Sequence, residues 1–255
     1  MARSYQNKSM DRGLRILDLF NENTIHLTAS EIAVAFSTTP ATLYPTLCTL
    51  VDLNYLSRDS RKRYSLGLKL LERSGQVLAQ LDVRRISRPH LTDLARQHQA
   101  TSDLGILYGK EVLYLERRVG HPAAMVGEVV GRRVPLHCTS IGKVLLAFLP
   151  DAEREQMIAS LELASYTPNT IVKPKALSKE LSHIVKQGYA VDIQEFHLGS
   201  SCVGAPIRSH GGSVIAALSL MLPVGTDVQE HDHDHKAQAV IETANAISRE
   251  LGYAN

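Results

Sequence analysis

The sequence predicts an α+β protein: a small N-terminal winged helix-turn-helix domain, a linker helix, and a larger domain of mixed helices and strands. Three observations support this prediction. Short stretches with helical apolar spacing, followed by two strand-like stretches, fill residues 1–66. Residues 67–84 continue in a helical pattern. Residues 85–255 mix strand-like and helical stretches, which is typical of an α+β domain built around one sheet.

Two helices are expected before residue 38. The stretch MDRGLRILDLFNEN, residues 10–23, carries Leu14 and Leu17 at helical spacing. Further on, Thr28 and Glu31 have the spacing of a capping box, in which each side chain accepts a hydrogen bond from the backbone N–H of the other residue. A second helix should therefore begin there. Its buried side should hold Ile32, Ala33 and Phe36.

The third helix is unusual because it contains a proline. The stretch TTPATLYPTLCTL covers residues 38–50. At about 100° per residue, Pro45 lies opposite the apolar side of this helix. That apolar side holds Leu43, Leu47, Leu50 and Val51. A proline inside a helix costs about 3 kcal/mol, but this cost largely disappears if Thr42 is the N-cap and Pro45 is the third helical residue. We therefore expect regular helix from about Thr42, or a kink at Pro45.

A basic hairpin follows the third helix. Residues 55–67, YLSRDSRKRYSLG, read as two short strands around a polar turn. Residues 1–90 hold 13 basic and 8 acidic side chains, whereas residues 91–255 hold 15 and 18, a division that suits a nucleic-acid module joined to a second domain. The turn could contact phosphates, although an ordinary solvated turn would have the same composition. We expect double-stranded DNA to be contacted by Thr39, Ala41, Thr42, Tyr44, Pro45, Thr46, Arg58, Arg61, Lys62 and Arg63.

The rest of the chain gives a coarser pattern. Residues 66–100 look largely helical, with a break expected near Pro89. Strand-like stretches cover residues 103–109, 111–119, 123–131, 132–137, 189–196, 201–209 and 213–222. Helices are expected over 141–149, over 177–187 with Gly188 as the stop signal, and over 236–252. The last of these has Val240, Ala244, Ile247 and Leu251 on one face.

Seven motifs in this order resemble the IclR family of bacterial transcriptional regulators over nearly the whole chain. They are RGLRILDLF, LTASEIA, YSLGLKLLE, GRRVPLHCTSIGKVLLA, GYAVDIQEF, CVGAPI and AALSL. The resemblance implies a winged helix-turn-helix domain, a linker helix and a C-terminal GAF-like domain that binds a small organic effector. It also implies a homodimer or dimer of dimers on a palindromic operator, and a ligand-responsive repressor or activator of a catabolic operon. Members usually carry arginine in the pattern S-T-x-Y-R-x-L, where this chain has A-T-L-Y-P-T-L with Pro45.

Pro45 leaves two interpretations of the N-terminal domain open. Arginine can bond guanine in a bidentate manner or hold a phosphate, and proline can do neither. Either DNA binding survives with a shifted sequence preference, or it is weakened or lost and the protein only senses a metabolite.

The resemblance also implies an effector pocket. Asp192 and Cys202 stand ten residues apart, and Ser219 follows seventeen later, with backbone amides at Ser140 and Ile141 completing the set. A helix N-terminus and a serine hydroxyl suit a carboxylate, and an aspartate can accept from a ligand hydroxyl. These features predict a small hydroxy-, keto- or sugar-acid effector.

Met221 departs from the family pattern in the predicted pocket. Acid-binding relatives often carry a small polar residue at this position, so Met221 makes one wall flexible and apolar. This argues against the simplest two-carbon and three-carbon acids and favours a larger effector with some apolar surface, such as an aromatic acid or a lactone.

Other features of the sequence exclude several classes of protein. No apolar run is long enough to span a membrane, and the N-terminus lacks a secretory pattern. Three widely spaced cysteines suggest no disulfide framework, which fits a cytoplasmic protein without a cofactor.

Two weaker patterns have alternative interpretations. The tract QEHDHDHK, residues 229–236, contains possible metal ligands, but we expect a solvated helix start and no metal site, because residues two apart do not share a helix face. Cys202 near His197 and Asp192 could suggest a thiol hydrolase, but its strand-like setting argues against an enzyme. We expect Glu195 and His197 to have structural roles.

Overall fold

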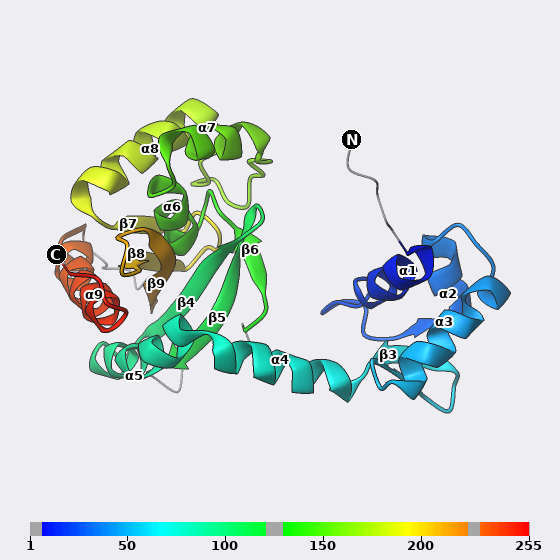
Figure 1. The fold of residues 1–255 in the computed structure, drawn as a ribbon. Helices are drawn as coiled ribbons and strands as arrows, with labels where there is room; N and C mark the ends of the chain where they lie inside the picture. Colours follow the sequence, from blue (N-terminus) through cyan, green and yellow to red (C-terminus); the bar gives the residue numbers. More distant parts are fainter. Residues whose placement is uncertain (1–6, 121–129, 224–229, 255) are drawn as a thin grey trace. The chain divides into compact units, whose positions relative to one another are not determined.

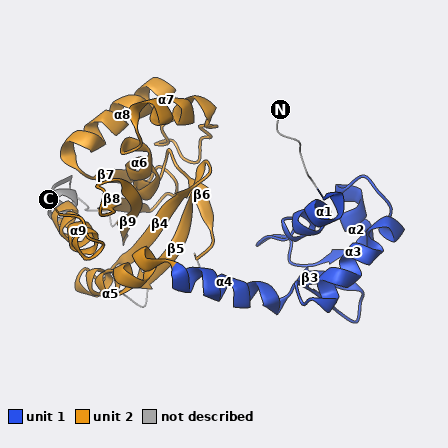
Figure 2. Cartoon of the chain, viewed as in Figure 1, with its two compact units in different colours: residues 1–80 blue, residues 81–255 orange. Residues whose placement is uncertain are grey.

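A computed structural model describes residues 7–120, 130–223 and 230–254 of the chain, with the backbone alone at residues 223 and 230–235. The chain divides into two compact units, Met1–Gln80 and Leu81–Asn255, which are described separately (Figure 2). Most of the strand expected over 123–131 lies outside the described residues. No helix in the described part of the chain is long and apolar enough to cross a membrane.

Unit 1 has three helices and a small sheet before its last helix (Figure 1). The elements are α1 (Lys8–Leu17), β1 (Leu27–Thr28), α2 (Ala29–Ala35), α3 (Pro40–Asp52), β2 (Leu56–Arg58), β3 (Arg63–Leu66) and α4 (Leu68–Gln80). The strands are antiparallel in the order β1-β3-β2. The predicted winged helix-turn-helix is confirmed, with the β2–β3 hairpin as its wing. The two-residue strand β1 is an addition that the sequence pattern did not indicate.

Local signals and apolar burial both hold unit 1 together. The Thr28 hydroxyl accepts from the Glu31 N–H at 3.3 Å, and the Glu31 carboxylate accepts from the Thr28 N–H at 2.7 Å, so the predicted capping box is confirmed. The core joins α1, α2, α3 and the wing. Its fully buried members are Ile16, Phe20, Ile32, Ala33, Leu43, Leu47, Leu56 and Tyr64.

Helix α3 begins at Pro40 with Thr39 as its N-cap, so the predicted start near Thr42 is wrong. The Thr39 hydroxyl accepts from the Thr42 N–H at 3.3 Å, and Pro40 occupies the first helical position, where a missing N–H has no cost. Pro45 therefore lies inside the helix, and the Ala41 carbonyl loses its helical donor. Burial of the opposite, leucine-bearing side stabilises the helix despite this defect.

The predicted break near Pro89 is also wrong. Helix α5 (Asp82–Gln97) runs through Pro89, and the break lies at Leu81, whose backbone is extended. Leu91 and Leu94 of α5 are buried in the core of unit 2. Their burial outweighs the roughly 3 kcal/mol that an interior proline costs.

Unit 2 is built on a six-stranded sheet in the order β6-β5-β4-β9-β8-β7, in which every neighbouring pair is antiparallel. The strands are β4 (Thr101–Tyr108), β5 (Glu111–Val119), β6 (Arg133–Pro135), β7 (Ala190–Ile193), β8 (Ser200–Arg208) and β9 (Val214–Pro223). The helices after α5 are α6 (Ser140–Ala147), α7 (Asp151–Ser160), α8 (Pro174–Gln187) and α9 (Glu230–Glu250). The α+β prediction is confirmed, including the left-handed Gly188 after α8, but α7 was not predicted.

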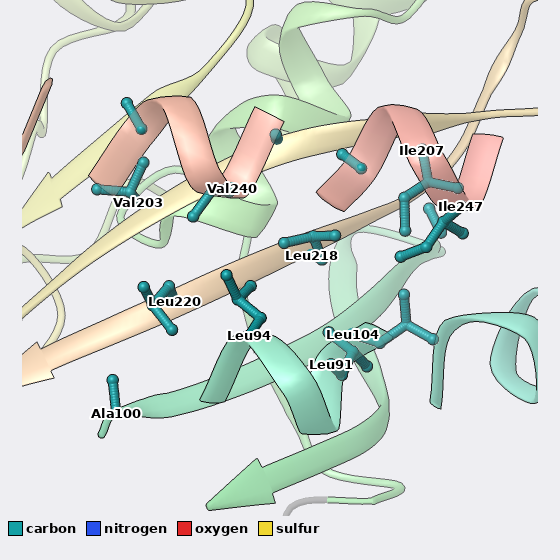
Figure 3. Packing of buried hydrophobic residues seen from close by; sticks show 14 of the residues in the cluster. Leu91, Leu94, Ala100, Leu104, Val203, Ile207, Leu218, Leu220, Val240 and Ile247 are labelled. Atoms are coloured by element: carbon teal, nitrogen blue, oxygen red, sulfur yellow. The ribbon is translucent and has the colours of Figure 1, made fainter. Parts of the chain in front are cut away.

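Helices cover both faces of the sheet (Figure 1). Helices α5 and α9 enclose one apolar cluster, and Figure 3 shows side chains of both helices converging on β8 and β9. Val240, Ala244 and Ile247 of α9 are fully buried there, as predicted. A second apolar cluster lies under α6 and α8, and this second face carries the site described next.

Candidate DNA-reading surface and effector pocket

The outer side of α3 presents predicted DNA contacts to solvent. Thr39, Ala41, Thr42 and Tyr44 are all exposed. The hydroxyls of Thr39, the N-cap, and Thr42 lie 2.9 Å apart and hydrogen-bond to each other. This side of α3 therefore offers hydroxyl groups, an aromatic ring and a helix N-terminus.

Pro45 and Thr46 lie beside α1. The exposed Pro45 ring and the half-buried Thr46 line an open groove of about 530 Å³ with α1 residues that include Gly13 and Leu14. A methyl group added at Gly13 would contact the Thr46 methyl at 3.6 Å. Thr46 is thus more enclosed by α1 than the sequence suggested.

The wing turn is organised by Asp59. Its carboxylate accepts from the backbone N–H groups of Arg61 and Arg63, at 2.9 and 2.8 Å, and pairs with the Arg63 guanidinium at 2.8 Å. The hydrogen bond from the Arg63 N–H lowers the pKa of Asp59, so the carboxylate stays charged. Arg61 and Lys62 are exposed, and the Arg58 guanidinium lies 5.4 Å from the centre of the Tyr64 ring. Within the described residues, Arg63 is the one of the four predicted wing cations that forms an ion pair with a carboxylate.

In unit 2, neighbouring strands bring the predicted effector residues together. Asp192 on β7 pairs with Cys202 on β8, and Cys202 pairs with Met221 on β9. Ser219 lies on the same face of β9 as Met221, because side chains two apart share a face. These four side chains line one cavity of about 70 Å³ together with Ser140 of α6.

The N-terminus of α6 closes this cavity. Thr139 is the N-cap, and its hydroxyl accepts from the Gly142 N–H at 3.1 Å. Among the described residues, the Ser140 and Ile141 N–H groups have no hydrogen-bond acceptor. The Ile141 side chain is buried in the apolar cluster under α6, so only its backbone can serve the cavity. A methyl group at Gly204 of β8 would lie 3.1–3.2 Å from Ser140 atoms, so glycine permits this close approach.

Asp192 is held deep in the cavity wall. Its Oδ1 accepts from the Glu195 N–H at 2.7 Å. Burial raises the pKa of Asp192 to about 7, with the Glu195 charge acting in the same direction and Lys143 opposing it. Near neutral pH the carboxyl can therefore either donate or accept a hydrogen bond.

The buried Lys143 ties α6 to the end of β7. Its ammonium donates to the carboxylates of Glu195 and Glu180, at 2.5 and 3.2 Å, and to the Val191 carbonyl at 2.5 Å. Glu195 thus has a packing partner, which agrees with the structural role expected for it.

Nine further residues line the cavity, and only His197 among them had been considered. They are Asp103, Tyr114, Arg117, Arg132, Val134, Thr139, Phe196, His197 and Ser200. Arg117 Nε and Nη2 donate to the two oxygens of Asp103 at 2.7 and 2.8 Å. Burial raises the pKa of Asp103, and the guanidinium of Arg117 opposes this shift. The Asp103–Arg117 pair was not predicted, because it depends on the register of the β4–β5 hairpin, and the apolar pattern of the sequence does not determine that register.

Neither of the alternative chemistries gains support from this geometry. Burial raises the pKa of Cys202 well above its ordinary value, whereas a nucleophilic cysteine needs an accessible thiolate. No cluster of three or more His, Cys, Asp or Glu side chains in the described part could hold a metal ion. Helix α9 spans Glu230–Glu250, but the side chains of residues 231–235 lie outside the described residues, so the solvated helix start stays a prediction.

Comparison with known families decides what kind of protein this is. A family model described as the IclR helix-turn-helix domain matches residues 9–60, and one described as bacterial transcriptional regulator IclR C-terminal matches residues 75–249. The chain belongs to the IclR family. It is a DNA-binding transcriptional regulator and not an enzyme, and its cavity lies in the IclR C-terminal region.

Relatives of this IclR protein match it from end to end. The HTH-type transcriptional regulator XynR of Escherichia coli is 36% identical over 247 residues, covering 96% of this chain and 98% of its own. The crystal structure of the Thermotoga maritima IclR, 33% identical, covers 97% of this chain and 100% of its own with a TM-score of 0.76. An IclR homologue from Microbacterium hydrocarbonoxydans was crystallised with 4-hydroxybenzoate. It is 28% identical, with a TM-score of 0.82, and covers 95% of this chain and 98% of its own.

Proposed function

We propose that this IclR regulator binds an operator through the outer side of α3 and the wing. This proposal rests mainly on one observation. The exposed N-terminus of α3, with its two threonine hydroxyls, occurs in the same domain as a wing turn with exposed Arg61 and Lys62. Phosphate contacts supply most of the affinity, and base contacts from α3 supply sequence preference. Pro45 offers an apolar contact, for example to a thymine methyl, in place of the family's arginine.

The test is fluorescence anisotropy of the full chain with DNA from upstream of its own gene and with an unrelated duplex, at two salt concentrations. Arg61→Ala should weaken binding to both duplexes and lower the salt slope by about one. Arg63→Ala is the matched control, because Asp59 already neutralises Arg63, and it should change the slope less. Equal affinity of the wild type for the two duplexes would contradict operator recognition.

Pro45→Arg separates the two interpretations of Pro45. If the wild type prefers its upstream DNA, Pro45 is a choice of specificity. If the wild type shows no preference and Pro45→Arg gains affinity for DNA, the wild-type protein has lost DNA recognition, and ligand binding is its remaining function.

We infer that the cavity binds a small organic acid with its carboxylate at the N-terminus of α6. The Ser140 and Ile141 N–H groups would donate to the carboxylate, where the helix dipole favours negative charge. The Ser219 hydroxyl, buried at the cavity wall, would donate as well. The relative crystallised with 4-hydroxybenzoate supports an organic acid as the class of effector.

Calorimetric titration with a panel of carboxylic acids, followed by DNA anisotropy, tests this site. Ser219→Ala should weaken acid binding and blunt the DNA response while unliganded DNA affinity stays nearly unchanged. Ser201→Ala is the control, since Ser201 is equally buried in the sheet but does not line the cavity. A parallel loss of ligand and DNA binding in Ser219→Ala would mean that Ser219 is structural.

The assembly we propose is a homodimer or a dimer of dimers. Helix α4 buries no residue within the chain, and its Leu68 and Leu71, which lie about 60° apart around the helix, are 81% and 70% exposed. Two large apolar side chains exposed on one side of a helix favour a partner that covers them. Light scattering of the purified protein would test the assembly, with a monomer as the contrary result.

Several finer points stay predictions. They are the GAF-like classification of unit 2, a repressor role at a catabolic operon, and a cytoplasmic location. So are the domain limits 1–66, 67–84 and 85–255, although unit 1 is found to end at Gln80.

A further inference from the structure

The cavity has a second polar feature besides the N-terminus of α6, which is an ion pair on strands β4 and β5. Asp103 on β4 lies opposite Ser219 on one side and Arg117 on the other in the sheet register. Its carboxylate is only 3% exposed and receives two N–H groups from Arg117. Tyr114, also a cavity-lining residue, comes from the same strand as Arg117.

This ion pair is an expensive feature for a cavity wall. Burying two charges costs free energy that a pair of apolar residues would avoid. Neighbouring buried positions of the same sheet, such as Leu104 and Val112, are apolar. The pair differs from them in facing the cavity.

Both partners keep unused hydrogen-bonding capacity. Arginine has five N–H donors, and Asp103 takes two of those on Arg117. A bidentate carboxylate likewise keeps two lone-pair directions. A hydroxyl group matches this combination, because it accepts from one partner while donating to the other. An alkyl or aromatic edge would leave the same groups without partners.

We propose that the Asp103–Arg117 pair recognises a hydroxyl group on the effector, so that the cavity selects hydroxylated carboxylic acids over their deoxy counterparts. The inference rests on the proposed acid site, since a carboxylate held at α6 places the rest of the ligand in the cavity that Asp103 and Arg117 line. A cavity of about 70 Å³ holds roughly five to seven water-sized groups, which fits a short hydroxy acid. Met221 is then one of the apolar contacts, with Val134 and Phe196, in a wall that also carries polar side chains.

The test is isothermal titration of the full chain with paired probes. The pairs are glycerate with propionate, threonate with butyrate, and 4-hydroxybenzoate with benzoate. In at least one pair the wild type should bind the hydroxylated acid tenfold or more tightly than its partner, because a site built around a hydroxyl discriminates strongly against its loss. The aliphatic and aromatic pairs show which carbon skeleton carries the hydroxyl.

The decisive variant replaces both charges together, Asp103→Leu with Arg117→Met. Removing a whole buried ion pair is tolerated far better than removing one partner, so this variant should fold. It should keep its affinity for the deoxy acid and lose the preference for the hydroxyl. The matched control replaces both partners of another buried pair, Arg84→Met with Glu116→Leu, because these two residues pair at 2.8 Å and neither lines the cavity. It should keep the preference of the wild type.

The possible failures are distinguishable. If the wild type binds acids of a pair equally well, or the double variant keeps the preference, the hydroxyl inference is overturned and the acid site stands. If no acid of any pair binds the wild type, the proposed acid site fails and the inference fails with it.

Discussion

Asp192 should make the stability of unit 2 fall as the pH rises toward neutrality. Its pKa is raised from 3.8 to about 7, chiefly by burial. Because the folded state holds the proton more tightly than the unfolded state, the stabilisation is fully present below pH 3.8. It is lost as the pH rises through 7. Three pKa units at about 1.4 kcal/mol each give a loss on the order of 4 kcal/mol.

Asp192→Asn should remove this pH dependence. Asparagine has the same shape and can still accept from the Glu195 N–H, but it does not ionise. The variant should match the wild type near pH 4. It should be more stable above pH 7, with a melting temperature higher by about 10 °C, since each kcal/mol is worth about 2–4 °C in a domain of this size.

Differential scanning calorimetry from pH 4.5 to 8.5, following the unfolding of residues 81–255 in the full chain, would measure the effect. Asp93→Asn is the control, because Asp93 forms a surface ion pair with Arg96 and should contribute little. Parallel curves for the wild type and Asp192→Asn would refute the reasoning. That result would mean that Asp192 titrates at its ordinary pKa and that its carboxylate is better solvated than its burial indicates.

Three further substitutions probe the packing around the two sites. Lys143→Met leaves Glu195 buried without its cation and should cost about 3–5 kcal/mol in urea unfolding. Gly204→Ala should push Ser140 away from β8 and weaken acid binding about tenfold in calorimetry, which is about 1.4 kcal/mol of binding free energy. The affinity for DNA should change little. Pro45→Ala should stabilise unit 1 by up to about 3 kcal/mol in a melting experiment, and no gain would mean that Pro45 is not strained in α3.

Local signals in the sequence were sufficient for most of the fold. The capping box at Thr28, the stop at Gly188 and the apolar face of α9 each depend on residues within a few positions of one another. The two proline predictions failed for the opposite reason. At Pro45 and Pro89, contacts between distant elements stabilise a helix that local propensity would interrupt.

The candidate site divides in the same way. Asp192, Cys202 and Ser219 could be placed from their spacing and the family resemblance, and they do line one cavity. The neighbouring ion pairs could not be predicted, because Lys143 contacts Glu195 across 52 positions of the chain and Arg117 contacts Asp103 across a hairpin. Burial and charge at such contacts follow from the sheet register and are not visible in a linear pattern.

The Asp103–Arg117 pair shows how a small irregularity can decide the chemistry of a pocket. From the turn, the β4–β5 hairpin pairs Tyr108 with Glu111 and continues regularly to Gly105 with Tyr114. An unbroken hairpin would then place Asp103 opposite Glu116, where like charges repel. The register shift between Leu104 and Gly105 instead brings Arg117 opposite Asp103.

The same shift reverses which face of the sheet each later residue of β5 occupies. Tyr114 lines the cavity, and strict alternation would send Glu116 there and Arg117 to the α5 face. Instead Glu116 forms an ion pair with Arg84 of α5, and Arg117 lines the cavity. One bulge therefore places a guanidinium paired to Asp103 in the cavity wall where a second carboxylate would otherwise lie, and it thereby creates the ion pair that we assign to the effector's hydroxyl.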